Sequence, residues 1–329
     1  MEENESRVFP ADSGPDCSPL DGRFPWMRSQ NDLYRALLCC WSADTCAPRL
    51  RSRWTPDNPT LGQCSTTAFL AQELFGGDVY GIPQEDGGVH CFNRVGGVSF
   101  DLTSEQFLPD SPDYSGASLQ SREERFSDPE RRERYEILRN RLLSFDRIAQ
   151  LKGEHPLNAI VVYYSLSGNS AYVAHRIARL IGAKELALNP EVPYPSGGFR
   201  KFFFGGKSAV TKEAPALLPY SVDWDAVDTV ILGTPVWAGT FVPPLRTFLR
   251  EQGAFLADKR VAAFACSSGG SAEKALERLR AEASVGSFLE TLSLVDPKDR
   301  PSGEKEQALF SFCEKISASP VSELSRRWE

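Results

Sequence analysis

The sequence predicts an α/β protein in which a doubly wound parallel sheet, with strand order 2-1-3-4-5, follows a smaller α+β domain. Three observations predict this class. From about residue 158 onward, short β-rich apolar runs alternate with helical stretches, as in the βαβ units of parallel sheets. Before that point, helical stretches surround two short strand-like runs that are split by a pair of glycines. The chain has 329 residues, enough for two domains of ordinary size.

Composition and charge argue against several classes of function. Hydrophobic residues make up 41% of the chain and charged residues 25%, so packed cores are expected. The net charge is −7: 17 Lys and Arg against 25 Asp and Glu precede Pro156, and 20 against 19 lie from there on. The acidic first half argues against a nucleic acid or an anionic membrane as its partner. No apolar run approaches the ~18 residues of a membrane span, and the acidic start is unlike a secretion signal, so we expect a cytoplasmic protein.

We expect four segments along the chain: a flexible arm over 1–28, an α+β domain over 29–150, a linker over 151–157 and an α/β domain over 158–329. In the first domain the patterns predict a helix over 29–46, an apolar helix over 65–75, a hairpin over 89–103, and a charged helical stretch over 121–151 whose main helix begins at Pro129. The eight cysteines include no CxxC pair, so reduced thiols and no metal site are expected.

The elements of the second domain alternate regularly. Strands are predicted at 158–164 and at about 184–188, 228–233, 260–266 and 288–295, and helices at about 170–181, 242–252, 271–283 and 303–318. In a parallel sheet of this order, ligands bind beyond the carboxyl ends of the strands, where the first, third and fourth strands lie together. The loops that follow these three strands are therefore the candidate binding site.

The first of these loops opens a helix and contains Ser165, Ser167, Gly168, Asn169 and Ser170, of which the three serines carry hydroxyl groups. Its backbone N–H groups and hydroxyls suit a phosphate, whose charge the helix dipole favours. The loop contains no Lys or Arg and no GxGxxG, so it is neither a triphosphate P-loop nor a dinucleotide fingerprint. The alternative interpretation is an ordinary capped turn between a strand and a helix.

The other two loops suit a planar ligand. The second contains a tryptophan among small residues: Pro235, Val236, Trp237, Ala238 and Gly239. The third combines small residues with glycines that let the backbone approach a ring: Cys266, Ser267, Ser268, Gly269 and Gly270.

With these motifs, YYSLSGNS, GTPVWAGTFVPPLRTFL and FACSSGG, residues 158–319 resemble the flavodoxin family. The resemblance implies flavin mononucleotide (FMN) as cofactor, with its phosphate at 165 and 167–170. It also implies an isoalloxazine flanked by 235–239 and 266–270, with Trp237 as the stacking ring. Two departures favour an FMN-dependent reductase over a diffusing electron carrier: the third loop lacks an aromatic residue, and the domain is nearly neutral. A long insertion over 190–215 is either a lid or partner surface, or a segment packed on the sheet edge.

A second constellation lies in the first domain. Cys64 immediately precedes the apolar helix, and a helix N-terminus lowers the pKa of a thiol. If Gly96-Gly97 forms the hairpin turn, His90 and Asp101 become diagonal neighbours on one face. A cysteine at a helix N-terminus with a His–Asp pair on adjacent strands is the arrangement of papain-like and transglutaminase-like enzymes. Gln63 and the Cys64 N–H are candidate donors to an oxyanion.

The stretch PTLGQCSTTAFLAQELFGG, followed by VHCFNRVGGVSFDLTSEQF, resembles the YunG-like family of small, uncharacterised bacterial proteins over about residues 30–145. The resemblance implies a compact α+β domain and a shared Cys–His–Asp set, but no substrate. The alternative interpretation is structural: a buried thiol, a hydrogen-bonded strand histidine and a capping aspartate.

Three hypotheses for the whole chain follow. It is an FMN-dependent oxidoreductase with an added domain, a cysteine hydrolase or acyltransferase whose second half senses redox state or docks partners, or a non-enzymatic protein with flavin as a structural ligand. The redox partner, whether a protein or a small-molecule electron donor or acceptor, is not specified by any motif in the sequence.

Overall fold

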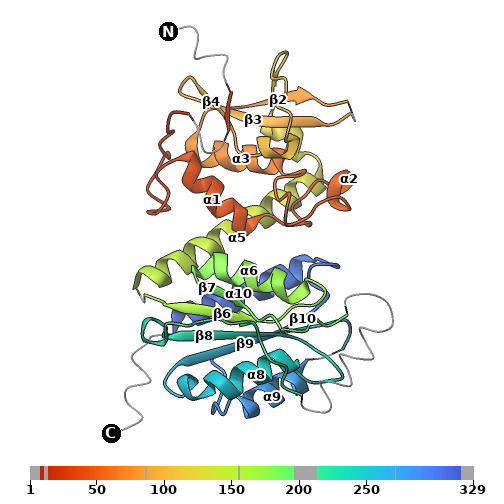
Figure 1. Cartoon of the computed structure of the whole chain (residues 1–329). Helices are drawn as coiled ribbons and strands as arrows, with labels where there is room; N and C mark the ends of the chain where they lie inside the picture. The colour runs from red at the N-terminus through yellow and green to blue at the C-terminus, as the bar shows by residue number, and fades with distance from the viewer. Residues whose placement is uncertain are drawn as a thin grey trace. The chain divides into compact units, whose positions relative to one another are not determined.

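The computed structural model describes residues 8–10, 14–85, 87–154, 156–195, 213–270 and 272–319. The chain divides into two compact units, Met1–Asp146 and Arg147–Glu329 (Figure 1). The division falls inside α5 (Pro129–Glu154), which begins at Pro129 as predicted. Because α5 continues to Glu154, most of the expected linker over 151–157 is helical. No described helix has the length and apolar character needed to cross a membrane.

The N-terminal unit contains a five-stranded sheet in the order β1-β4-β3-β2-β5. Its strands are β1 (Val8–Pro10), β2 (Asp78–Pro83), β3 (Val89–Val95), β4 (Val98–Asp101) and β5 (Ser118–Leu119). The predicted hairpin is present, with Val95 opposite Val98 and Asn93 opposite Phe100. This register follows from the two-residue Gly96-Gly97 turn, in which both glycines have positive φ.

The expected flexible arm over 1–28 is largely ordered where it is described. β1 pairs in parallel with β4, and Cys17, Phe24 and Met27 are buried. Burial of these apolar side chains explains why this Pro- and Gly-rich segment is held in place. Residues 1–7 and 11–13 lie outside the described part of the chain.

The helices of this unit are α1 (Gln30–Cys40), α2 (Pro48–Arg51), α3 (Cys64–Phe75), α4 (Arg122–Phe126) and α5, with a 3₁₀ turn at Ser104–Phe107. The first helix ends at Cys40, six residues before the predicted end at 46. Thr45 Oγ1 both accepts from the Ser42 N–H and donates to the Ser42 carbonyl, and such local bonds compete with a helix. α3 packs on β3, where Asn93 Nδ2 donates to the Ala68 carbonyl at 2.8 Å.

The C-terminal unit contains a five-stranded parallel sheet in the order β7-β6-β8-β9-β10, which reads 2-1-3-4-5 along the chain. Its strands are β6 (Ala159–Tyr163), β7 (Lys184–Ala187), β8 (Thr229–Pro235), β9 (Arg260–Ser267) and β10 (Thr291–Val295). α6 (Asn169–Ile181) and α10 (Gly303–Ala318) cover one face, and α8 (Pro243–Gln252) and α9 (Glu273–Glu282) cover the other (Figure 1). Two 3₁₀ turns, Trp224–Ala226 and Gly253–Leu256, complete the unit.

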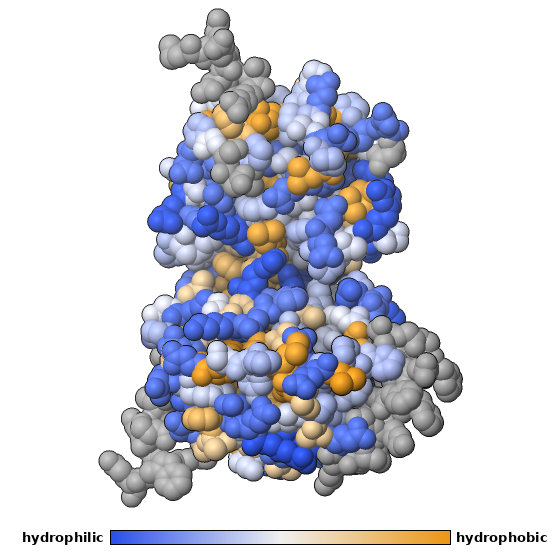
Figure 2. Space-filling view, viewed as in Figure 1, coloured by the Kyte–Doolittle hydropathy of each residue, from blue (hydrophilic) through white to orange (hydrophobic). Residues whose placement is uncertain are grey.

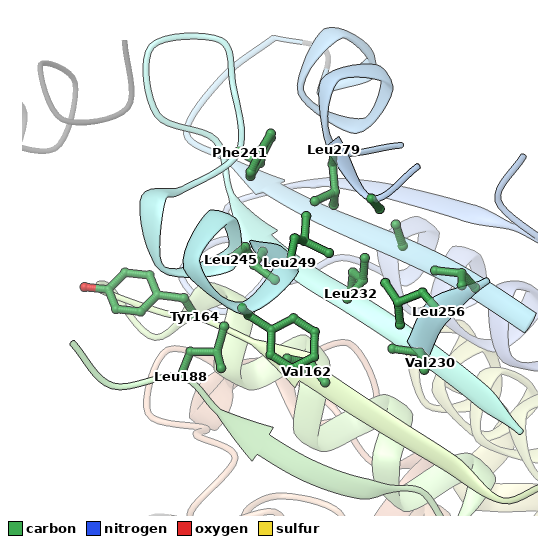
Figure 3. Close-up of a cluster of buried hydrophobic side chains, with 14 of the residues drawn as sticks. Val162, Tyr164, Leu188, Val230, Leu232, Phe241, Leu245, Leu249, Leu256 and Leu279 are labelled. Carbon is green, nitrogen blue, oxygen red and sulfur yellow. The ribbon is translucent and has the colours of Figure 1, made fainter. Parts of the chain in front are cut away.

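Packing on both faces explains the uniformly apolar strands. On the α8 face, Val162 and Leu232 from the strands meet Leu245 and Leu249 from the helix, all of them buried (Figure 3). The surface shown in Figure 2 is mostly hydrophilic, with small separate hydrophobic patches.

The residues at the two ends of the insertion over 190–215 are hydrogen-bonded to each other. The Glu191 N–H donates to the Ala216 carbonyl at 2.9 Å, and the Leu218 N–H donates to the Asn189 carbonyl at 2.7 Å. These paired ends fix where the insertion begins and finishes. Residues 196–212, for which a lid or partner surface was expected, lie outside the described residues.

Candidate functional site

The predicted phosphate loop joins β6 to α6 at the carboxyl edge of the sheet. Gly168 caps α6 with a φ of +91°, a conformation that favours glycine. Ser165 Oγ is buried and has no hydrogen-bond partner among the described residues. A buried hydroxyl without a partner is rare in folded proteins, and it suits a loop that receives a ligand oxygen.

A fourth loop, over 296–300 after β10, lies against the predicted phosphate loop, and sequence reasoning missed it. The loop that opens α6 contains no Lys or Arg, but the Lys298 ammonium group lies beside it. A Cβ built at Gly168 would lie 3.0 Å from Nζ of Lys298. Asn169 holds the two loops together: its Nδ2 donates to Asp299 Oδ2 at 2.7 Å, and its Oδ1 accepts from the Lys298 N–H at 2.9 Å. The contact of Asn169 with a phosphate stays a prediction.

The second loop forms a tight turn at the end of β8. The Trp237 N–H donates to the Thr240 carbonyl at 2.9 Å, and the Thr240 N–H donates back at 3.0 Å. The two residues between them, Ala238 (φ +48°) and Gly239 (φ +72°), are left-handed and exposed. Such a turn carries its central backbone groups clear of the sheet, where a flat ligand can approach them.

Trp237 belongs to a group of three aromatic rings, of which sequence reasoning identified one. Its ring lies edge-to-face against Tyr164 and Tyr194, with centroid distances of 5.7 and 5.1 Å. Tyr194 comes from the described beginning of the insertion. The insertion therefore contributes a ring to this site, whereas stacking of Trp237 on a flavin stays a prediction.

The third loop follows β9 and contacts both of the others. The Cys266 carbonyl accepts from the Val236 N–H at 2.8 Å. Burial raises the pKa of the Cys266 thiol to about 12, against the smaller opposing effect of the Ser170 hydroxyl, so Cys266 is a neutral thiol. Ser267 Oγ donates to the Gly270 carbonyl at 3.0 Å, and 268–270 are exposed. The structure thus brings the three predicted loops together.

The Cys–His–Asp set occupies the N-terminal unit. Cys64 is the first residue of α3, His90 lies in β3 and Asp101 ends β4. His90 Nε2 lies 2.6 Å from Asp101 Oδ2, and both side chains are buried. Cys64 is partly exposed, with Sγ 3.7 Å from the Val89 carbonyl.

Sequence reasoning missed two side chains that hold this set, Tyr114 and Gln106, whereas the cap that Asp101 makes on Thr103 is the one that the structural interpretation expects. Asp101 Oδ1 accepts from the Thr103 N–H at 2.8 Å and from its hydroxyl at 3.1 Å, while Oδ2 accepts from Tyr114 at 2.8 Å. Gln106 Nε2 lies 3.2 Å from His90 Nδ1 and donates to the Thr103 carbonyl at 2.9 Å. Tyr114 and Gln106 follow β4, and nothing in their local sequence pattern indicates that they return to it.

The electrostatics of the set favour a thiolate. A hydrogen bond from Cys91, followed by the hydrogen bond and charge of His90, lowers the pKa of Cys64 well below that of an ordinary thiol, despite the opposing effect of burial. Burial alone would lower the pKa of His90, but the charge and hydrogen bond of Asp101 outweigh it and raise that pKa to about 10. The set therefore favours a thiolate next to a protonated imidazole.

One expectation at this site is wrong. Gln63 was a candidate oxyanion donor, but its side chain is fully buried and its Nε2 donates to the Ser42 carbonyl at 3.0 Å. Gln106, which lines the same cavity as Cys64 and His90, carries the amide that faces the site instead. This cavity has a volume of about 280 Å³.

Comparison with known proteins divides the chain in the same way. The family model described as YunG protein matches residues 29–146, and the one described as Flavodoxin matches residues 158–295. The uncharacterised protein YunG of Bacillus subtilis (strain 168) is 40% identical over 88 residues, which cover 27% of this chain and 73% of that protein. The Flavodoxin match supports FMN as the cofactor of the C-terminal unit.

Three solved structures illustrate the range of similarity. A flavoprotein from Lactobacillus acidophilus NCFM in complex with FMN has a TM-score of 0.38 and 19% identity, covering 42% of this chain and 93% of its own. A flavoprotein from Bacteroides uniformis ATCC 8492 has a TM-score of 0.39 and 19% identity, covering 47% and 98%. An FMN-dependent NADH-azoreductase from Bacillus anthracis has a TM-score of 0.29 and 9% identity, covering 49% and 98%. Over residues 29–146 this chain belongs to the YunG family, and over residues 158–295 it carries a flavodoxin domain.

Proposed function

We propose that the C-terminal unit binds FMN and acts as an FMN-dependent reductase. The observation that carries this proposal is the meeting of three loops at the carboxyl edge of the sheet, where Ser165 Oγ is buried without a partner among the described residues. The site fits the cofactor chemically, since it offers hydroxyls, the N-terminus of α6 and an ammonium group to a phosphate.

In this arrangement the hydroxyls of Ser165 and Ser167, the backbone N–H groups at the start of α6 and the Lys298 ammonium group would hold the phosphate. The turn at Trp237 and the exposed residues 268–270 would flank the ring system. Bound FMN supplies oxidation–reduction chemistry by accepting and donating electrons. The chain would contribute binding and orientation, and the residues that both loops expose are small.

Two features favour a reductase over a diffusing carrier. The residues from Pro156 onward contain 20 basic and 19 acidic side chains, so this part of the chain offers no strong charge for steering to a partner. No GxGxxG fingerprint is present, so an electron donor would approach the exposed ring transiently rather than occupy a dinucleotide fold.

The test is retention of FMN by the purified full-length chain. The protein is mixed with FMN, desalted and measured by absorbance, before and after reduction with dithionite. We expect a yellow protein with one flavin per chain that bleaches on reduction. Ser167→Glu places a carboxylate against the phosphate and should abolish retention. Ser287→Glu makes the same charge change in an exposed loop at the amino edge of the sheet and should not. A wild-type chain that retains no FMN contradicts the proposal.

A second function is favoured by the geometry of the N-terminal unit. We infer that Cys64 is the nucleophile of an acyl-transfer or hydrolysis reaction. Its thiolate attacks an acyl carbonyl carbon and forms a thioester, while the leaving group departs with the proton held by His90. Water or a second acceptor then attacks the thioester, returning its proton to His90 and releasing Cys64. Asp101 orients the imidazole and stabilises its charge.

This second function is tested by alkylation. We expect iodoacetamide at pH 6 to label Cys64 faster than the other seven cysteines, as measured by peptide mass spectrometry. His90→Gln should remove this preference, because the thiolate loses its cationic partner. Uniform labelling of accessible cysteines in the wild-type chain contradicts an activated thiolate.

A further inference from the structure

We propose that the cavity at Cys64 binds an anionic group, a carboxylate or phosphate, carried by a small acyl substrate. This inference rests on the proposed nucleophilic role of Cys64 and names the substrate class of that site. What carries it is the lining of the cavity, which includes five arginine residues: Arg49, Arg53, Arg125, Arg131 and Arg134.

The five arginines come from separate segments. Arg49 lies in α2 and Arg53 shortly after it, Arg125 lies in α4, and Arg131 and Arg134 lie in α5. No Asp or Glu is among the described residues that line the cavity. Three helices and the segment after α2 therefore bring arginines to the cavity that Cys64 and His90 also line.

The five arginines gather at one cavity although the first half of the chain carries more acidic than basic side chains. Before Pro156, acidic residues outnumber basic ones by 25 to 17, and five of those 17 basic side chains line this one cavity. Surface arginines on an acidic domain are ordinarily interspersed with carboxylates. Their gathering around a nucleophile indicates selection for an anion.

Carboxylates outside the cavity compensate part of this charge. Arg131 pairs with Asp128 at 3.4 Å, and Arg134 pairs with Glu130 at 2.8 Å. Arg125, by contrast, donates to the neutral amide oxygen of Gln120, and the Arg53 side chain is exposed. Arg53 and Arg125 are thus the arginines best placed to receive a ligand anion, because binding would not require them to abandon a carboxylate.

The size and chemistry of the cavity set the kind of substrate. A volume of about 280 Å³ lies near the lower end of small-ligand sites, so it accepts a small molecule or the end of a chain. Guanidinium groups bind carboxylate and phosphate through paired, charge-assisted hydrogen bonds. An anionic group held by Arg53 and Arg125 would place the acyl carbon of the same molecule before Cys64.

The test compares two alkylating agents of similar size, anionic iodoacetate and neutral iodoacetamide. The rate of labelling at Cys64 is measured with each reagent for the folded full-length chain and, as reference, for the chain unfolded in urea. We expect the ratio of iodoacetate to iodoacetamide rates to be ~2- to 5-fold higher in the folded protein, within the range that one exposed charge pair supplies. Salt at 0.5 M should reduce this ratio.

Arg53→Gln and Arg125→Gln should each lower the ratio of the iodoacetate rate to the iodoacetamide rate, both rates being measured on the same variant. Arg35→Gln makes the same charge change at an exposed site in α1 that does not line the cavity, and it should have no effect. Protection of Cys64 by inorganic phosphate but not by succinate, or the reverse, identifies which anion the cavity prefers.

The possible failures are distinguishable. Slow iodoacetamide labelling of Cys64 at pH 6 contradicts the nucleophilic role itself. Suppose instead that iodoacetamide labels Cys64 fast, but that the rate ratio equals that of the unfolded chain or is insensitive to both Arg53→Gln and Arg125→Gln. That result keeps Cys64 as the nucleophile and contradicts an anionic substrate.

Discussion

Nε2 of His90 lies 2.6 Å from Oδ2 of Asp101, on neighbouring strands whose register the Gly96-Gly97 turn sets. Both side chains are buried, so the attraction between them is weakly screened by solvent. With a pKa of about 10, the imidazole stays protonated through the neutral range. Cys64 therefore has a cationic partner at any pH at which the protein is expected to work.

Asp101→Asn should remove the positive charge of His90 at neutral pH. Without the carboxylate, the pKa of His90 falls toward its ordinary value of about 6.5, and the imidazolium is lost at neutral pH. The pKa of Cys64 then rises, because its thiolate loses the neighbouring positive charge. We expect the pH of half-maximal iodoacetamide labelling of Cys64 to move upward by about 1 unit or more.

Tyr114→Phe is the matched control for that change. It removes one hydrogen bond to Asp101 and keeps the carboxylate, so the pH profile of Cys64 labelling should shift much less than in Asp101→Asn. Circular dichroism checks that both variants are folded. Equal shifts in the two variants would mean that packing, rather than the charge of Asp101, governs the thiol.

Lys298→Gln should weaken FMN binding. Charge-assisted hydrogen bonds contribute about 1.5–3 kcal/mol, so the Kd for FMN should rise about tenfold or more. Riboflavin, which has no phosphate, should bind the variant and the wild type equally. Lys274→Gln, an exposed position in α9, serves as the control for net charge. A parallel loss of riboflavin affinity would assign Lys298 to the fold rather than to the phosphate.

Tyr194→Ala should loosen the aromatic group at Trp237. Edge-to-face contacts contribute about 0.5–1.5 kcal/mol each beyond buried area, and Tyr194 makes such contacts with both Trp237 and Tyr164. We expect a several-fold weaker affinity for FMN and for riboflavin alike, together with a change in tryptophan fluorescence. Tyr194→Phe keeps the ring and should restore both signals. If Tyr194→Ala binds flavin normally, Trp237 is positioned without this partner.

Leu232→Ala should destabilise the C-terminal unit. Leu232 lies in β8 and is fully buried against α8 (Figure 3). Removing a buried leucine side chain costs about 2–5 kcal/mol of unfolding free energy. Leu218→Ala, at a half-exposed position, should change that free energy by less than about 0.5 kcal/mol. Urea denaturation of the two variants measures the difference.

The sequence predicts the C-terminal unit well, because its signals are local. Buried strands such as 159–163 are continuous apolar runs, and α6 begins after a glycine and ends before one. The hairpin of β3 and β4 was equally predictable, since a two-residue glycine turn fixes the register. The sequence alone therefore predicts that His90 and Asp101 lie close together.

Non-local features escaped prediction for physical reasons. β2 contains Gly81 and ends at Pro83, residues that ordinarily argue against a strand. Gly81 is required there because a Cβ would lie 2.5 Å from Val89 on the neighbouring strand. Lys298, Tyr114 and Gln106 reach their sites through the packing of distant segments, and no spacing rule links them to the loops that they complete.

The position of Lys298 beside Gly168 also has a consequence for how the protein is assembled. The hydroxyl-rich loop belongs to the first strand of its sheet, whereas the ammonium group follows the last strand. A ribosome that has synthesised the chain only as far as β9 has already added the serines of that loop but not yet Lys298. Under the proposed function, capture of the FMN phosphate by both loops therefore requires a chain whose synthesis has passed β10.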